Sequence, residues 1–282
     1  MENRIDYRID GHIAHIHMVR GAKMNALDND MMDALIEASA RLKADTSVRA
    51  AVLSGEGRAF CAGLDMANFA SMASAGNKEA DAKPAKPREK LATRTHGRAN
   101  RPQQVAYAWR DIDVPVIAAA QGFAVGGGFQ LYLGADIRYA APATKFSIME
   151  IKWGLVPDMG TTHVMARLCR EDVLKELAYT GRIFEAEEAL QHGFLTRICD
   201  DPLAAAMETA HQIAARNPDA TRRMKRLFNE PADRFLDDTL MLESVLQDEV
   251  IGKPNQIEAV LAELEGRPAD YATDKNKAEA AE

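Results

Sequence analysis

Glycine-bearing turns and a pair of carboxylates are the parts of this sequence that could do chemistry. Gly126, Gly127 and Gly128 follow a short apolar run, and a dense apolar segment starts directly after them. A strand, a glycine turn and a helix start in this order present free backbone N–H groups to a negatively charged oxygen. The spacing matches neither a dinucleotide-binding motif nor a P-loop, which disfavours a nucleotide. A tight turn that serves only packing is the alternative.

A second glycine-bearing turn lies roughly sixty residues upstream of the first. Residues 49–54 form a short apolar run typical of a strand, and residues 55–66 follow it with Gly55, Gly57 and Gly63. If the two turns converge, one N–H from each would form a two-donor oxyanion hole. The spacing permits this arrangement without proving it.

Two carboxylates, Glu150 and Asp158, lie eight residues apart on an expected loop among apolar neighbours. An acid in an apolar wall has a raised pKa and can exchange protons near neutrality. The alternative is that both are ordinary surface acids. Burial of the two side chains distinguishes these interpretations.

Composition limits the possible classes of protein. The 282 residues suffice for one large or two modest domains, and 47% hydrophobic with 27% charged residues is typical of a soluble globular protein. The net charge of −7 argues against a nucleic-acid binder. Cys61, Cys169 and Cys199 have no spacing typical of a disulfide framework or zinc site. Neither a signal peptide nor a membrane-spanning run is recognised, so we expect the protein to be located in a reducing cytoplasm.

The elements that must position these groups form an α/β pattern followed by helices. Short strands are expected at residues 13–19, 49–54, 115–120, 136–140 and 145–147, with a helix that begins near Asp28. Helices are expected at residues 171–179, 185–191, 203–216, 220–228 and 239–250. Helices gathered after an α/β core commonly cover the core or mediate assembly. His15 and His17 share one strand face and lack a third metal ligand, so they are interpreted as a satisfied strand face.

Residues 66–104 interrupt this pattern with a basic, variable insert. Residues 77–101 carry eight Lys or Arg against three Asp or Glu. A mobile surface loop with some helix is the ordinary interpretation, because charge runs are usually solvated. The alternative is a flap whose cations meet a phosphorylated ligand. The tail from residue 266 is expected to fray.

Five segments, in this order, resemble the crotonase (enoyl-CoA hydratase/isomerase) superfamily over about residues 5–265. They are Arg20–Leu27 (RGAKMNAL), Phe60–Asp65 (FCAGLD), Pro115–Gly128 (PVIAAAQGFAVGGG), Phe146–Asp158 (FSIMEIKWGLVPD) and Thr180–Gly193 (TGRIFEAEEALQHG). The resemblance implies an α/β spiral of β-β-α turns with a C-terminal helical trimerisation region. Residues 1–200 would be the core with the acyl-CoA site, residues 201–265 the oligomerisation region and residues 266–282 a flexible tail.

The resemblance also implies a coenzyme A thioester as substrate, with no separate cofactor and no metal. The thioester oxygen would accept hydrogen bonds from the N–H groups of Leu64 and Gly127, and the nucleotide end would lie along one side of the core. The substrate-binding residues carried over are Ala22, Lys23, Arg58, Ala62, Gly63, Leu64, Asp65 and Gly127.

One departure from the family bears on the reaction. The two glutamates of the family's hydratases would fall at Gln130 and Glu150, and an amide holds a water molecule but takes no proton at neutral pH. A single glutamate in the second position resembles the double-bond isomerases. Asp158 resembles the second acid of the dienoyl-CoA isomerases, which normally also have an acid at the position of Gln130. Two further departures, Gly21 and Met149 where prolines are common, do not touch this chemistry.

The sequence therefore predicts an acyl-CoA enzyme with Glu150 as its acid–base group, leaning to a double-bond shift. Hydration with one glutamate stays open, as does thioester hydrolysis with Gln130 helping to hold water. A non-catalytic acyl-CoA binding protein is the alternative from another class, and the presence of Glu150 argues against it. The acyl chain stays unidentified, because residues 66–104 would shape its pocket. Trimers or dimers of trimers are expected through residues 201–264.

Overall fold

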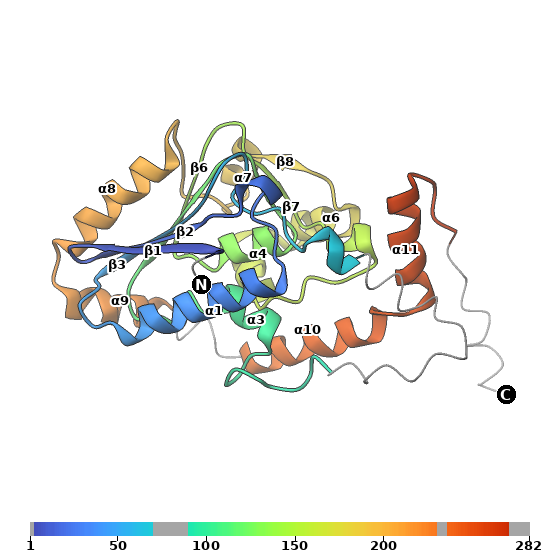
Figure 1. Cartoon of the computed structure of the whole chain (residues 1–282), viewed down its shortest axis with the longest axis horizontal. Helices are drawn as coiled ribbons and strands as arrows, with labels where there is room; N and C mark the ends of the chain where they lie inside the picture. Colours follow the sequence, from blue (N-terminus) through green and yellow to red (C-terminus); the bar gives the residue numbers. More distant parts are fainter. Residues whose placement is uncertain (1–2, 70–89, 230–235, 271–282) are drawn as a thin grey trace.

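A six-stranded sheet flanked by helices forms the centre of the chain (Figure 1). The computed structural model describes residues 3–69, 90–229 and 236–270. Strand β1 pairs antiparallel with β2, and the other neighbours in the sheet pair in parallel. In spatial order the strands are β1 (Ile5–Asp10), β2 (Ile13–Met18), β3 (Ala50–Gly55), β4 (Val116–Ala120), β6 (Ile137–Ala140) and β9 (Arg197–Ile198).

A second sheet of three short strands lies beside the first. Its order is β5 (Phe123–Val125), β7 (Lys145–Ser147) and β8 (Phe184–Glu185). Strands β5 and β7 run in parallel, and β8 is antiparallel to β7. The predicted α/β class is thereby confirmed. The five expected strands agree with β2, β3, β4, β6 and β7 to within one residue at each end, whereas β1, β5, β8 and β9 were not predicted.

The sequence of the central strands explains their position. Every residue of β3 (AAVLSG) and of β4 (VIAAA) is buried. Parallel strands covered on both faces are near-continuous apolar runs, because each face meets a packed layer. One face packs against Ala206, Ala210 and Ala214 of helix α8, and the other contributes to the larger core cluster with helix α1.

The helices follow the expected pattern, with additions that the sequence did not reveal. Helix α1 begins after Asp28, whose side chain accepts a hydrogen bond of 2.8 Å from the backbone N–H of Met31. The remaining helical bounds are η1 (Gly21–Lys23), α1 (Asn29–Ala44), α3 (Arg101–Tyr107), α4 (Gly127–Leu133), η2 (Glu150–Trp153), α5 (Thr162–Leu168), α6 (Glu171–Thr180), α7 (Ala186–Gln191), α8 (Pro202–Ala214), α9 (Pro218–Asn229), α10 (Leu236–Val250) and α11 (Pro254–Glu265). Elements η1, η2, α5 and α11 were not predicted, and α3 was anticipated only as some helix within the insert.

Helix α4 is the buried helix that starts at the glycine triplet. Its Phe129 ring lies 5.7 Å from Phe146, 5.7 Å from Phe184 and 5.3 Å from Phe194, measured between centroids. Aromatic contacts at this distance add to the stabilisation from buried apolar area. The cluster anchors α4 against the small sheet, and so fixes the position of the turn from which α4 starts.

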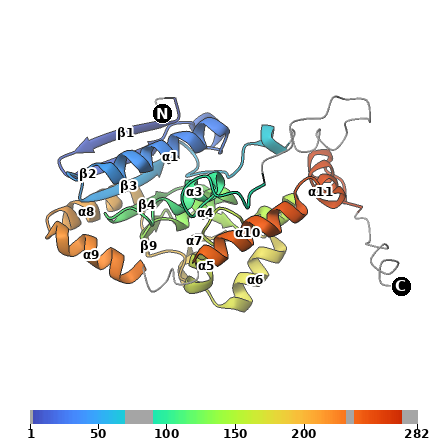
Figure 2. The same ribbon diagram turned by 90° about the horizontal axis from the view of Figure 1, so that it is seen from below.

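The last helices spread along the molecule, with α8 and α9 at one end, α11 at the other and α10 between them (Figures 1 and 2). Lys225 ties α9 to the core, because its buried Nζ lies 2.8 Å from Asp136 Oδ2 and donates to the carbonyl oxygens of Trp109 and Val114. Helix α11 packs on η2, where Gln256 Nε2 donates to the carbonyl oxygen of Trp153 over 3.3 Å.

Part of the predicted basic insert lies outside the described residues, since the description stops at residue 69 and resumes at residue 90. The described part includes the start of α3. One of its cations, Arg94, is not a solvated charge. It donates to Gln103 Oε1 over 2.9 Å and to Ser244 Oγ of α10 over 2.7 Å. The expectation of a solvated charge run is therefore wrong at Arg94, because its guanidinium binds acceptors on the buried side chains of Gln103 and Ser244.

Candidate active site

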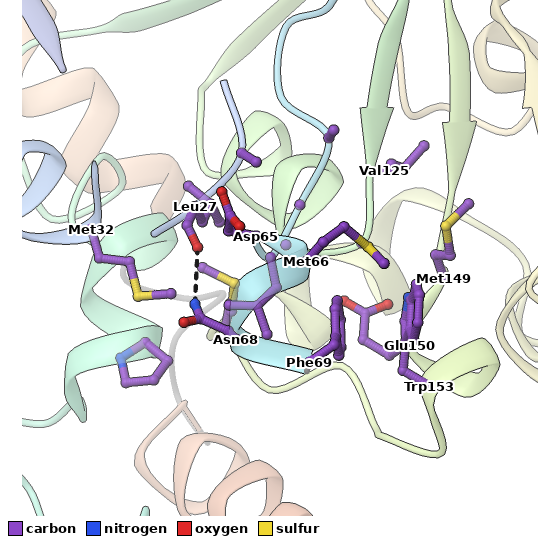
Figure 3. A pocket seen from close by; sticks show the side chains of 18 of the residues that line it. Leu27, Met32, Asp65, Met66, Asn68, Phe69, Val125, Met149, Glu150 and Trp153 are labelled. Atoms are coloured by element: carbon purple, nitrogen blue, oxygen red, sulfur yellow. Dashed lines mark hydrogen bonds between the residues drawn. The ribbon is translucent and has the colours of Figure 1, made fainter. Parts of the chain in front are cut away.

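A cavity of about 820 Å³ opens beside the glycine turns, next to the start of α4. Its wall is mainly apolar and is built from segments far apart in the sequence (Figure 3). The wall includes every predicted site residue except Gln130, namely Ala22, Lys23, Arg58, Ala62, Gly63, Leu64, Asp65, Gly127, Glu150 and Asp158. Ala22, Lys23 and Arg58 are exposed and lie at its outer edge.

The two glycine turns meet in this wall. Backbone hydrogen bonds join them, from Cys61 N to Phe123 O (3.0 Å) and from Val125 N to Cys61 O (3.1 Å). At Gly63, which has a φ of +79°, an added Cβ would lie 2.7 Å from Val125 O and 3.4 Å from Gly127 N. Only glycine fits such a position, because other residues combine backbone strain there with a clash. The convergence that the spacing permitted is present.

The backbone N–H groups of Leu64 and Gly127 are available in the cavity wall. Within residues 3–69, 90–229 and 236–270, neither donates to an acceptor, whereas the preceding Gly126 N donates to Ser147 O over 3.0 Å. Both residues line the cavity. Two neighbouring N–H groups that face one space can hold a single oxygen and stabilise negative charge on it.

Glu150 begins η2, which follows β7 after Ile148 and Met149, and is buried at the cavity wall. Its Oε1 accepts a hydrogen bond of 2.7 Å from Gln130 Nε2. Its Oε2 has no hydrogen-bond partner among the residues that the structure describes. Burial raises the pKa of Glu150, and the hydrogen bond from Gln130 opposes this shift only in part. A carboxyl group whose pKa is raised in this way is a stronger proton acceptor than an ordinary surface glutamate, as a general base requires.

Gln130 lies beneath the cavity wall on α4 and orients Glu150. Its Oε1 accepts from Met159 N over 2.9 Å and from Thr161 Oγ1 over 3.4 Å. Because these donors fix which end of the amide is oxygen, its NH₂ group must face Glu150. Gln130 thus contacts the predicted acid–base group directly, although it does not line the cavity itself.

The other predicted polar residues differ in their surroundings. Asp158 is half-buried and lines the same cavity as Glu150. Asp65 lies 2.6 Å from Arg20 and accepts from Ala67 N over 2.9 Å. The Ala67 N–H and the Arg20 guanidinium hold the pKa of Asp65 below its usual value despite partial burial. Asp65 is therefore an ionised group that stabilises its turn.

Sequence reasoning identified apolar neighbours of Glu150 but missed the distant segments that complete the aromatic and sulfur-bearing part of the wall. Phe69 and Trp153 stack with centroids 4.0 Å apart and an interplanar angle of 16°, close to Glu150 (Figure 3). Met66 and Met149 lie near them, and Gln247 and Ile251 reach the cavity from α10 and its end. Nothing in the local sequence indicated these contacts, because they join segments that approach each other only in the folded chain.

Two further groups have structural partners. Cys61 is buried beneath the first turn, its Sγ donates to Asn25 O over 3.1 Å, and burial raises the pKa of its thiol to about 12. His15 Nε2 and His17 Nδ1 share Ser54 Oγ at 2.7 and 2.8 Å. The predicted satisfied strand face is thereby explained by a hydroxyl group of the adjacent strand.

Comparisons with known proteins agree with this architecture. The enoyl-CoA hydratase/isomerase family profile matches residues 8–274. A Mycobacterium tuberculosis protein named "Probable enoyl-CoA hydratase EchA14" is 36% identical over 207 residues, 73% of this chain and 74% of its own. The mitochondrial Δ(3,5)-Δ(2,4)-dienoyl-CoA isomerase of Mus musculus is 28% identical over 268 residues, 93% of this chain and 79% of its own.

The crystal structure of an enoyl-CoA hydratase/isomerase from Mycobacterium paratuberculosis superposes with a TM-score of 0.79 at 25% identity, and covers 92% of this chain and 98% of its own. The class defined by fold and site is thus an α/β crotonase fold with two sheets and C-terminal helices. The chain belongs to the enoyl-CoA hydratase/isomerase family of enzymes. No helix of the described ranges is long and apolar enough to cross a membrane.

Proposed function

We propose that this enzyme shifts a carbon–carbon double bond in an enoyl-CoA thioester, with Glu150 as the group that moves the proton. The observation that carries the proposal is the 2.7 Å hydrogen bond from Gln130 to Glu150. Where a hydratase of the family would have a second carboxylate, this chain has an amide that donates a hydrogen bond and takes no proton at neutral pH. One carboxylate suffices to move one proton between two carbons.

In the proposed reaction, Glu150 Oε2 removes a proton from C2 of a 3-enoyl thioester. The electron pair of the broken C–H bond moves toward the thioester carbonyl, and the oxygen gains the negative charge of a dienolate. Glu150 then returns the same proton to C4, and the double bond lies between C2 and C3. No atom is gained or lost, and the carboxylate returns to its starting charge.

The oxygen of this dienolate would lie between the N–H groups of Leu64 and Gly127. Removing one such donor typically costs about 2.7–4 kcal/mol of transition-state stabilisation in other enzymes. The support for this role is that both N–H groups lack acceptors among the described residues and line one cavity with Glu150. Ala22, Lys23 and Arg58 at the outer edge would contact the nucleotide end of the substrate. Ala62, Gly63 and Asp65 would shape the glycine turn that presents the Leu64 N–H group to the substrate.

Hydration of a 2-enoyl thioester is the second candidate function. The relative at 36% identity is named a probable enoyl-CoA hydratase, whereas the relative at 28% identity is named a dienoyl-CoA isomerase. Asp158 in the same cavity could serve as a second acid in a dienoyl shift. These alternatives differ in whether water is consumed, which a product assay distinguishes.

The substitution Glu150→Gln tests the proposal. It keeps the shape and removes the acid–base group, so we expect kcat to fall by about 10²–10⁴-fold with little change in substrate binding. The assay follows 3-enoyl-CoA isomerisation and 2-enoyl-CoA hydration separately across chain lengths. Asp158→Asn is the matched control and is expected to lose far less isomerase activity.

Either of two results would contradict the proposal. Full activity of Glu150→Gln on every substrate turned over by the parent would remove Glu150 from the mechanism. Efficient hydration by the parent without isomerisation would make the chain a hydratase in which Gln130 replaces a glutamate.

A further inference from the structure

A second buried glutamate, Glu243, lies near the site but comes from the C-terminal helix α10. Its side chain is 5% exposed, and its carboxylate bonds to the loop that connects Asp158 to α5. Oε2 accepts from Gly160 N over 2.8 Å, and Oε1 accepts from Thr162 N over 3.3 Å and from Thr162 Oγ1. A helix some eighty residues away thus holds the backbone of this loop.

The opposite side of the same loop holds Gln130. Met159 N and Thr161 Oγ1 donate to Gln130 Oε1, while Gly160 and Thr162 donate to Glu243. Successive residues of the loop therefore face alternately the amide of Gln130 and the carboxylate of Glu243. Any shift of the loop away from Glu243 moves the donor that defines the oxygen end of the Gln130 amide.

The orientation of that amide determines whether its NH₂ group or its oxygen faces the Glu150 carboxylate. With its oxygen toward Met159 N, Gln130 donates its N–H to Glu150 Oε1. With the amide reversed, its oxygen would face the carboxylate, and the hydrogen bond would be replaced by repulsion. The bond to Oε1 also determines that Oε2 is the oxygen left for a substrate.

We propose that Glu243 is a positioning residue for the proton transfer: it holds residues 159–162 so that Gln130 aligns Glu150 for catalysis. This inference rests on the proposed acid–base role of Glu150. It gives α10 a role in aligning the acid–base group, which no motif near the glycine turns indicates.

The chemistry around Glu243 requires a carboxylate. It accepts from three groups of Gly160 and Thr162 and from Gln103 Nε2 over 3.2 Å. All four partners are donors in this arrangement, and an ionised carboxylate is an acceptor only. Burial raises the pKa of Glu243, and these hydrogen bonds oppose the shift. An amide in its place would direct an NH₂ group at N–H donors. Glu243→Gln therefore retains the shape of the side chain but loses hydrogen bonds to the loop, because one of its two terminal groups no longer accepts.

The test compares Glu243→Gln with Ser244→Ala, which removes a buried hydrogen-bonding group from the same helix. Ser244 Oγ forms hydrogen bonds with Arg94, Asn100 and Gln103, and in the part of the chain that the structure describes it forms none with residues 159–162. Both variants are expected to lower the unfolding temperature. Only Glu243→Gln is expected to lower kcat, by about 10- to 100-fold as for a small misplacement of a reacting group, with KM within about twofold.

A double-mutant cycle then separates positioning from general loss of stability. In a Gln130→Met background the amide that the loop aligns is gone, so Glu243→Gln should change kcat by less than about threefold. Residues that act through one another are non-additive, whereas independent effects add. Equal fold-losses in both backgrounds, or a kcat for Glu243→Gln equal to that of Ser244→Ala, would overturn the inference.

Thr162→Val keeps the test decisive if Glu243→Gln does not fold. It removes only the Oγ1 donor to Glu243, and a smaller kcat loss that vanishes in the Gln130→Met background is expected. An unchanged kcat would overturn the inference. Glu150→Gln is assayed in parallel: if it retains activity, the proposed function fails, and if it loses activity while the loop variants do not, only the role of Glu243 fails.

Discussion

At the scale of single residues, the site depends on which side chains can carry a proton. Gln130 has the length of a glutamate and the position of one, and it differs by a group that donates to Glu150 rather than repelling it. Its identity could be read from the sequence, and so could the candidate role of Glu150. The orientation of its amide could not, because the donors that fix it come from Met159 and Thr161, about thirty residues away.

Replacing Gln130 by glutamate should change both the reaction and its pH dependence. In Gln130→Glu, one oxygen can still accept from Met159 N, while the other faces Glu150 Oε1, 2.7 Å from the former amide nitrogen. Two carboxylates at this distance share a proton, so one of their pKa values rises above the already raised pKa of Glu150. We expect faster water addition to a 2-enoyl-CoA and unchanged or slower isomerisation.

The sign of the pH effect follows from the base that must be ionised. The shared proton persists to a higher pH, so the acid limb of the isomerisation profile should move to higher pH in Gln130→Glu. The profile of kcat/KM against pH measures this directly. An acid limb at an unchanged or lower pH, together with no gain in hydration, would show that the two side chains do not interact in solution.

At the scale of elements, local sequence patterns predicted an element correctly where a strand is buried along its whole length or a capping residue marks the start of a helix. The apolar run of β4 and the Asp28 cap of α1 are such cases. Local patterns did not predict η2 and α11. These two elements pack against each other although they lie far apart in the sequence. The glycine turns could be identified from the sequence because each is a local feature. The wall formed by Phe69, Trp153 and α10 could not, because it joins segments that are distant in the sequence.

Gly128 should be the least replaceable glycine of the triplet. An added Cβ would lie 2.2 Å from Cys61 O and 2.8 Å from Cys61 C, which are backbone atoms of the other turn. Gly128→Ala therefore forces α4 away from that turn, and overpacking of this kind typically costs about 1–3 kcal/mol and occasionally more. We expect a loss at or above the upper end of that range in urea unfolding, with loss of activity.

Gly97→Ala is the matched control for this substitution. Gly97 has a φ of +66°, and nothing lies within 4 Å of its added Cβ. It therefore reports backbone strain without crowding, for which roughly 1–2 kcal/mol is expected. If the two variants lose equal stability, crowding between the turns does not determine the position of α4.

At the scale of the whole molecule, the C-terminal helices leave apolar side chains uncovered. Leu227 and Phe228 of α9 are 64% and 69% exposed, and Leu242 of α10 is 57% exposed. Clustered apolar surface of this kind is commonly buried in symmetric homo-oligomers. By contrast α8, which also follows residue 200, packs against the main sheet of its own chain. The boundary at residue 200 stays a prediction.

We expect trimers or dimers of trimers in solution, formed through α9 and α10. Light scattering at micromolar concentration measures the mass of the particle directly. Phe228→Glu should lower that mass, because a charge is costly in an apolar contact. Tyr179→Glu on α6, where the tyrosine is 71% exposed, is the control and should leave the mass unchanged. A monomeric parent would contradict the expectation.

The burial of Cys61 has a consequence for how this protein withstands reactive small molecules. The thiolate is the form of cysteine that reacts, and a pKa of about 12 leaves almost none of it at neutral pH. Cys169 and Cys199 also have raised thiol pKa values through burial. The proposed product, a 2-enoyl thioester, is electrophilic, and burial of the Cys61 thiol beneath the first glycine turn keeps that thiol unreactive toward it. Conjugate addition of the Cys61 thiolate to C3 of that product, which would form a thioether, is therefore disfavoured.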